Sequence, residues 1–143
     1  MTVRVERRFD VEAPVEDVWA FISDPGNRAR AVSVVDTFET RDDTTIWHIS
    51  LPIPLLRKTI AVRTKDVELD PPQFVKFQGN SRAFDVEGSH RIEATESGSS
   101  VTNVFSVSGR MPGVERFFRR NLDGELKNLE RALKRHVRRE GDS

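Results

Sequence analysis

The stretch VERFFRRNLDGELKNLERALKRHVRRE, residues 114–140, decides the fold because it is the longest segment with one sustained period. Its apolar side chains recur every three or four positions, which places them on one side of an α-helix. A long helix with a single apolar side needs a matching apolar surface to cover it. The residues on that side are Val114, Phe118, Leu122, Leu126, Leu129, Leu133 and Val137.

The chain before this helix has the pattern of strands. Residues 3–11 alternate apolar and charged side chains, which is typical of a half-buried strand. Pro14 and the two acids that follow predict a short helix ending near Asp24, and residues 27–32 predict a second one. Six further strand-like runs lie between turn-forming clusters, at residues 34–40, 45–51, 57–69, 73–79, 84–95 and 100–109.

These elements predict an α+β fold. A seven-stranded antiparallel sheet, with two short helices after the first strand, would curl around the long C-terminal helix. The length of 143 residues suits a single domain, which we expect to span residues 1–140, with a short polar tail at 141–143. Because a twisted sheet and a helix diverge along their length, a cavity is expected between them.

Composition excludes several classes of function. Lysine and arginine together number 23, as do aspartate and glutamate, so no net charge favours nucleic acid. The lack of cysteine removes disulfides and thiolate metal sites, and the three histidines lie far apart, so we expect no metal and no cofactor. No apolar run is long enough for a membrane span, and we expect a cytoplasmic protein.

Several segments resemble the START-like or SRPBCC superfamily of helix-grip proteins. They are the opening Phe9-x-Val11-x-Ala13-Pro14-x-x-x-Val18-Trp19-x-Phe21-Ile22-x-Asp24-Pro25, then Leu69-Asp70-Pro71-Pro72 with Phe77-x-Gly79, then Gly88-Ser89-x-Arg91-Ile92-Glu93, and the terminal helix. The resemblance covers essentially the whole chain and extends to the polyketide cyclase/dehydrase group and to a group of accessory proteins associated with carbon monoxide dehydrogenase. It implies a hydrophobic pocket between the sheet and the long helix, used by different members for lipids, sterols, quinones or polyketides.

The candidate pocket residues are apolar rings with a few polar groups. Alternation along 84–95 and 100–109 places His90 and Asn103 on the apolar face, where each must find a hydrogen-bond partner. Trp47 is expected to face inward because burying its ring is worth more than burying His48. The full set of expected ligand-binding residues is Trp47, Phe77, His90, Asn103, Phe105, Phe117, Phe118 and Asn121.

Three functions remain open at this stage. The first is non-catalytic binding of a hydrophobic molecule such as a lipid, isoprenoid, quinone or polyketide, with transport or sequestration as its purpose. The second is a cyclase/aromatase-like enzyme in which His90 is the general acid and base, helped by Arg63 or Asn103. The third is an accessory protein that docks on a partner through the basic side of the terminal helix, or through the apolar loop at residues 52–56.

The basic side of the terminal helix is expected to face solvent. Its cations are offset from the apolar stripe by about 200° of helix rotation. The most economical interpretation is a solvated outer face with Glu–Lys pairs one turn apart, such as Glu130 and Lys134. The cations are Arg116, Arg120, Lys127, Arg131, Lys134 and Arg138.

Overall fold

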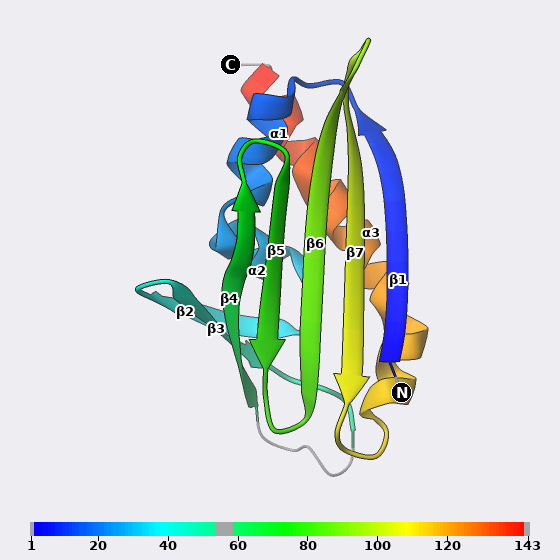
Figure 1. Cartoon of the computed structure of the whole chain (residues 1–143). Coiled ribbons are helices and arrows are strands. Elements are labelled where there is room, and N and C mark those ends of the chain that lie inside the picture. Colours follow the sequence, from blue (N-terminus) through cyan, green and yellow to red (C-terminus); the bar gives the residue numbers. More distant parts are fainter. Residues whose placement is uncertain (1, 54–58, 142–143) are drawn as a thin grey trace.

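The computed structural model describes residues 2–53 and 59–141, with side chains through residue 138. Seven strands form one antiparallel sheet in the order β1-β7-β6-β5-β4-β3-β2, and three helices lie together on one side of it (Figure 1). The strands are β1 (Thr2–Val11), β2 (Val35–Arg41), β3 (Thr44–Ile49), β4 (Ile60–Asp70), β5 (Phe74–Asn80), β6 (Phe84–Thr95) and β7 (Gly98–Gly109). The helices are α1 (Val15–Ile22), α2 (Pro25–Ala31) and α3 (Val114–Gly141).

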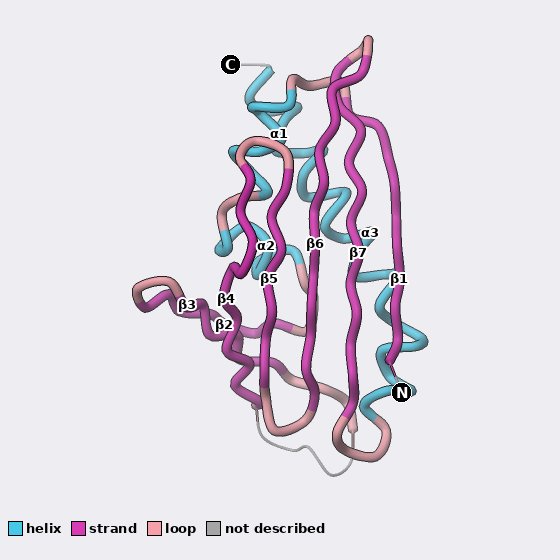
Figure 2. The backbone as a smooth tube through the Cα atoms, viewed as in Figure 1, coloured by secondary structure: helices cyan, strands magenta, loops and turns pink. Residues whose placement is uncertain are grey.

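The predicted fold class is confirmed, and the sheet is a meander closed at one edge by the first strand. Strands β2 to β7 follow one another through consecutive antiparallel pairs, while β1 pairs with β7 from Thr2↔Ser108 to Val11↔Ser99. Figure 2 shows the hairpin of β2 and β3 turning away from the direction of the longer strands, as the twist of the sheet requires. One face of the sheet therefore wraps toward α3.

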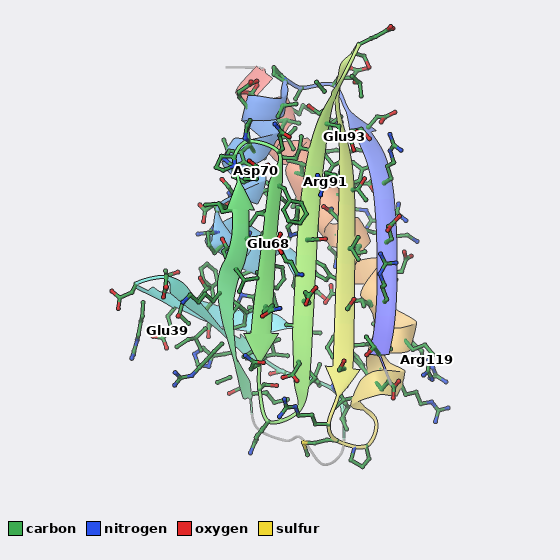
Figure 3. All side chains as sticks on the ribbon, in the orientation of Figure 1. Glu39, Glu68, Asp70, Arg91, Glu93 and Arg119 are labelled. Carbon is green, nitrogen blue, oxygen red and sulfur yellow. The ribbon has the colours of Figure 1, made fainter. Side chains whose placement is uncertain are left out.

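The two faces of the sheet differ in polarity. Glu68 on β4 and Arg91 and Glu93 on β6 are exposed, and Figure 3 shows them on the face turned away from the helices. The opposite face carries the alternate residues, including Val62, Phe77 and Ile92, which are buried with the apolar side of α3. The apolar side chains that alternate along the strands and those that recur every 3.6 residues along α3 thus pack together in one core.

Several predicted boundaries differ from the structure, including the end of β3, which lies at Ile49 and not at residue 51, and at two of them a polar residue explains the difference. The second short helix begins at Pro25 and not at Asn27, because the Asp24 side chain accepts a hydrogen bond from the Gly26 amide at 2.8 Å and caps the helix. Strand β7 begins at Gly98 and not at residue 100, because Ser99 is buried and its hydroxyl donates to the Ala13 carbonyl at 2.6 Å. In both places a polar residue belongs to an element where the sequence suggested only a break.

The predicted stripes of α3 are borne out with one exception in each. The apolar stripe is buried along the helix, apart from Val137, which is partly exposed near its end. Most of the basic stripe is exposed, but Lys134 folds back over the ring of Phe9, with Nζ 5.3 Å from its centroid. Residues 54–56 of the loop considered for docking lie outside the described residues. No described helix is long and apolar enough to cross a membrane.

Candidate functional site

The space between the sheet and α3 is an apolar cavity of about 20 Å³. This volume accommodates roughly one water molecule, so the site is closed in this conformation. The sheet, α3 and the segment joining α2 to β2 all contribute to its walls. The lining residues are Val32, Val34, Trp47, Ile49, Phe84, Val86, Phe105, Val107, Phe118, Leu122 and Glu125.

Trp47 is the polar element of the sheet wall of this cavity. Pairing of β3 with β4 sets Trp47 opposite Val62, and alternation along β3 turns its ring into the core, where it is 4% exposed. Its ring centroid lies 5.6 Å from that of Phe77. The indole Nε1 has no hydrogen-bond partner within residues 2–53 and 59–138, so a buried N–H next to the cavity lacks an acceptor.

His90 and Asn103 form a polar pair next to the cavity but are not among its lining residues. They are cross-strand neighbours in β6 and β7, and both are fully buried. Nδ1 of His90 lies 2.8 Å from Oδ1 of Asn103, so the ring N–H donates to the amide oxygen. His90 Nε2 and Asn103 Nδ2 have no partner among the described side chains and backbone. The pair therefore keeps one free acceptor and one free donor.

The environment of His90 keeps its ring neutral. Burial, followed by the positive charge of Arg28, lowers the pKa of His90 from 6.5 to about 3, although the hydrogen bond to Asn103 acts in the opposite direction. Its ring lies 6.1 Å from that of Phe77 and 5.9 Å from that of Phe105. A neutral ring enclosed by aromatic side chains cannot supply a proton at neutral pH.

Arg28 is a charged group in the core that the sequence did not indicate. It is 4% exposed, donates to Asp66 Oδ1 at 2.6 Å, and lies 5.3 Å from the ring centroid of Phe77. Burial lowers its pKa, while Asp66 opposes the change. The ion pair joins α2 to β4 and brings a positive charge near His90.

Glu125 is the second buried charge, and it lies at the edge of the cavity. Its carboxylate accepts from the Ser33 amide at 3.0 Å, the Ser33 hydroxyl at 2.9 Å and the Val34 amide at 3.4 Å. Asn128 Nδ2 also donates to it at 2.8 Å. These bonds fasten the segment between α2 and β2 onto α3, where Val34 forms part of the cavity wall.

The expected ligand-binding residues fall in three places. Trp47, Phe105 and Phe118 line the cavity, whereas Phe77, His90 and Asn103 form the buried cluster beside it. The other two, Phe117 and Asn121, line an open hollow on the outside of α3. The last pair is farther from the core than expected, because Asn121 is exposed and donates to the Phe117 carbonyl one turn earlier. Arg63, considered as a catalytic helper, is exposed on the outer face of β4.

Glu125 could have been found from the sequence. It follows Leu122 by three positions and precedes Leu129 by four, so it lies on the apolar side of α3. Arg28 had no such signal, because its partner Asp66 is 38 residues away and the helix containing it is short. Within residues 2–53 and 59–138, no group of three or more His, Asp or Glu side chains is placed to hold a metal ion.

A seven-stranded antiparallel sheet around one long helix, with an apolar cavity between them, defines a helix-grip protein of the START-like class. The family model described as "Polyketide cyclase / dehydrase and lipid transport" matches residues 2–134, and the chain belongs to that family. This confirms the superfamily that the sequence motifs resembled. No curated protein is similar enough in sequence to count as a match.

Solved structures with the same fold have diverse descriptions. A conserved protein from Geobacillus kaustophilus is 12% identical, with a TM-score of 0.76, and the match covers 97% of this chain and 96% of that one. A START superfamily protein from Mycobacterium smegmatis is 12% identical, with a TM-score of 0.72 and coverages of 95% and 97%. The Zhui aromatase/cyclase from Streptomyces sp. R1128 is 14% identical, with a TM-score of 0.65 and coverages of 99% and 94%. Family and fold together support a role in ligand binding or in a cyclase-type reaction.

Proposed function

We propose that this protein binds a hydrophobic small molecule, of the lipid, isoprenoid, quinone or polyketide type, between its sheet and α3. The observation that carries the proposal is the cavity wall itself. It is built from apolar side chains of β3, β6, β7 and α3, together with a tryptophan whose N–H has no acceptor. A ligand with a mainly apolar body would match this wall.

Binding requires the cavity to expand. Pockets for small organic ligands typically have volumes of about 300–1,000 Å³, far above the 20 Å³ of this one. The wall most easily displaced is the segment containing Val34, because it is held to α3 mainly through the Glu125 carboxylate. The ligand is therefore expected to enter between this segment and α3.

The geometry favours binding over acid–base catalysis by His90. A cyclase using this residue would need its ring in contact with substrate, but His90 is fully buried and its pKa is lowered to about 3. Its ring stacks on that of Phe77 and meets that of Phe105 edge-on, and His90 is not among the residues that line the cavity. Binding of a hydrophobic ligand requires only an apolar surface, and the cavity wall supplies one.

The test is whether apolar compounds stabilise the protein through this cavity. Native mass spectrometry of the purified protein is expected to detect a co-purified hydrophobic compound, or an added long-chain alcohol, quinone or isoprenoid is expected to raise the melting temperature. Val34→Trp should remove the increase by filling the cavity from its edge, with Val34→Phe as a smaller filler. Val67→Trp is the matched control, because Val67 is 46% exposed on β4.

Two results would contradict the proposal. One is the absence of any co-purified compound together with no thermal shift across the three compound classes. The other is a shift that remains unchanged in both folded Val34 variants, since the compound would then bind elsewhere.

A further inference from the structure

A basic groove of about 670 Å³ runs between α2 and the second half of α3, outside the apolar cavity. Figure 1 shows the two helices together on the same side of the sheet. Arg30 comes from α2, and Arg131, Arg135 and His136 come from α3. The rest of the lining is apolar or uncharged, and it includes no carboxylate.

The three arginines of this groove lack acidic partners within the described residues. Three other cations of α3 have an acidic partner one turn away, in the pairs Arg119–Glu115, Lys127–Asp123 and Lys134–Glu130. Arg30 instead donates to the Asn27 amide oxygen at 3.0 Å and lies 5.2 Å from the ring of Phe38. Guanidinium groups bind carboxylates and phosphates through paired hydrogen bonds, so this set is suited to an anion.

Shared wall residues connect the groove to the edge of the apolar cavity. A second open hollow, of about 340 Å³, shares Ser33, Asn128 and Arg131 with the basic groove. The same hollow shares Val34 and Glu125 with the cavity. Glu125 is the one acid in its lining, and both of its carboxylate oxygens are already occupied by donors from Ser33 and Asn128. Only the segment held by Glu125 thus lies between the hollow beside Arg131 and the cavity.

We infer that the groove binds the anionic end of the ligand, a carboxylate or a phosphate, while the apolar body of the same molecule occupies the cavity. This inference rests on the proposed function and narrows it: the ligand is an anionic amphiphile. Arg131 and Arg135 are positioned to hold the charged end of the ligand. The apolar part of the ligand would lie in the hollow beside Val34, toward the cavity.

The test compares three probes with the same ten-carbon chain: decanoate, decyl phosphate and decanol. Binding to the full chain is measured by calorimetry below the micelle concentrations of the probes. The wild type is expected to bind both anions at least about tenfold more tightly than decanol. Arg131→Gln/Arg135→Gln should abolish that difference while leaving the affinity for decanol unchanged. Because both arginines are exposed, the variant is expected to fold, as its unfolding curve will show.

Arg116→Gln/Arg120→Gln is the matched control. It removes the same charge from exposed positions of the same helix, outside the lining of the groove. The control should retain the preference for anions. If both double variants lost the same amount of anion affinity, the effect would come from the overall positive charge of the helix, and the inference would be overturned.

The remaining outcomes separate this inference from the proposed function. Equal binding of all three probes would overturn the anionic site and support apolar binding. Failure of all three, decanol included, would count against both. Two further arms identify the source of the anion. In the first, inorganic phosphate is compared with decyl phosphate, and equal affinities would overturn the link between groove and cavity. In the second, binding of phosphatidylglycerol vesicles without binding of monomeric decyl phosphate would overturn it as well.

Discussion

His90 is the residue whose surroundings most restrict the chemistry of the core. It is uncharged, fully buried and hydrogen-bonded to Asn103, with aromatic rings on two sides. Its free Nε2, and the free Nδ2 of Asn103, are polar groups that the fold leaves without partners in the described residues. Buried polar groups without partners lower the stability of an apolar core, so substitutions at this pair are expected to change stability measurably.

The lowered pKa of His90 predicts an acid sensitivity of the fold. Between pH 6.5 and about 3 the unfolded chain binds a proton at this residue and the folded chain does not, so stability falls as pH falls. Above pH 6.5 the ring is neutral in both states and contributes no pH dependence. The unfolding free energy of the wild type should therefore drop between pH 7 and about pH 4.5. The drop in His90→Gln should be smaller by about 2–3 kcal/mol.

Urea unfolding at a series of pH values measures this difference. Glutamine retains hydrogen-bonding atoms that can reach Asn103 but does not titrate. Parallel curves of unfolding free energy against pH for the two proteins would show that His90 does not carry the effect.

At the scale of elements, the glycines of α3 and β6 differ in the space around them. Gly124 in α3 is exposed, and a Cβ added there would meet no atom within 4 Å outside the local helix. Gly88 in β6 lies directly between Phe77 and Phe105 on the neighbouring strands, and a Cβ there would come within 2.2 Å of the Phe77 ring. The absent side chain of Gly88 lets two aromatic rings meet beside His90.

This contrast predicts opposite signs for the same substitution. Gly124→Ala should raise the unfolding free energy by about 0.5–1 kcal/mol, because alanine is a better helix former and meets no obstacle. Gly88→Ala should lower it by about 1–3 kcal/mol or more, because two buried rings must shift. Chemical denaturation checks both. A loss of stability in Gly124→Ala would reveal a close approach on α3 that the structure does not contain.

At the scale of the whole molecule, access to the core depends on one connection. The segment between α2 and β2 closes the edge of the cavity, and Glu125 holds it through the Ser33 and Val34 amides. The sheet and α3 are otherwise joined by the buried apolar stripe along the helix and by the ion pairs of Arg7 on β1 with Asp123 and Glu130. We therefore expect the molecule to open at this segment before any other part of the cavity wall moves.

Glu125→Gln tests that expectation. The amide can accept fewer of the bonds that Ser33, Val34 and Asn128 donate, so the variant should lose about 1–3 kcal/mol of stability. Hydrogen exchange at the Ser33 and Val34 amides should accelerate at least about tenfold relative to the wild type. Glu115→Gln, which breaks only a pair with Arg119 on the same helix, is the control. Equal exchange at the two amides in both variants would place the opening elsewhere.

Much of this architecture could be predicted from local patterns. Alternation in β6 and β7 placed His90 and Asn103 inward, and the period of α3 placed its leucines against the sheet, as the structure confirms. The candidate site was less predictable, because Phe117 is only partly buried and Asn121 is exposed, although both belong to the correct helix. Asn121 directly precedes the buried Leu122, yet one residue of helix rotation, about 100°, is enough to place it in solvent.

The sequence by itself determined the order of elements, the faces they bury and the superfamily, because these depend on periods and turn residues that act within a few positions. Only the tertiary structure decided how much space remains between the sheet and α3, since that volume depends on how rings from β3, β6, β7 and α3 interlock. It also decided that Arg28 is buried and that Ser33 is the partner of Glu125, because Asp66 and Ser33 lie far from these residues in the chain. Burial of a charge depends on partners that only the folded chain brings together.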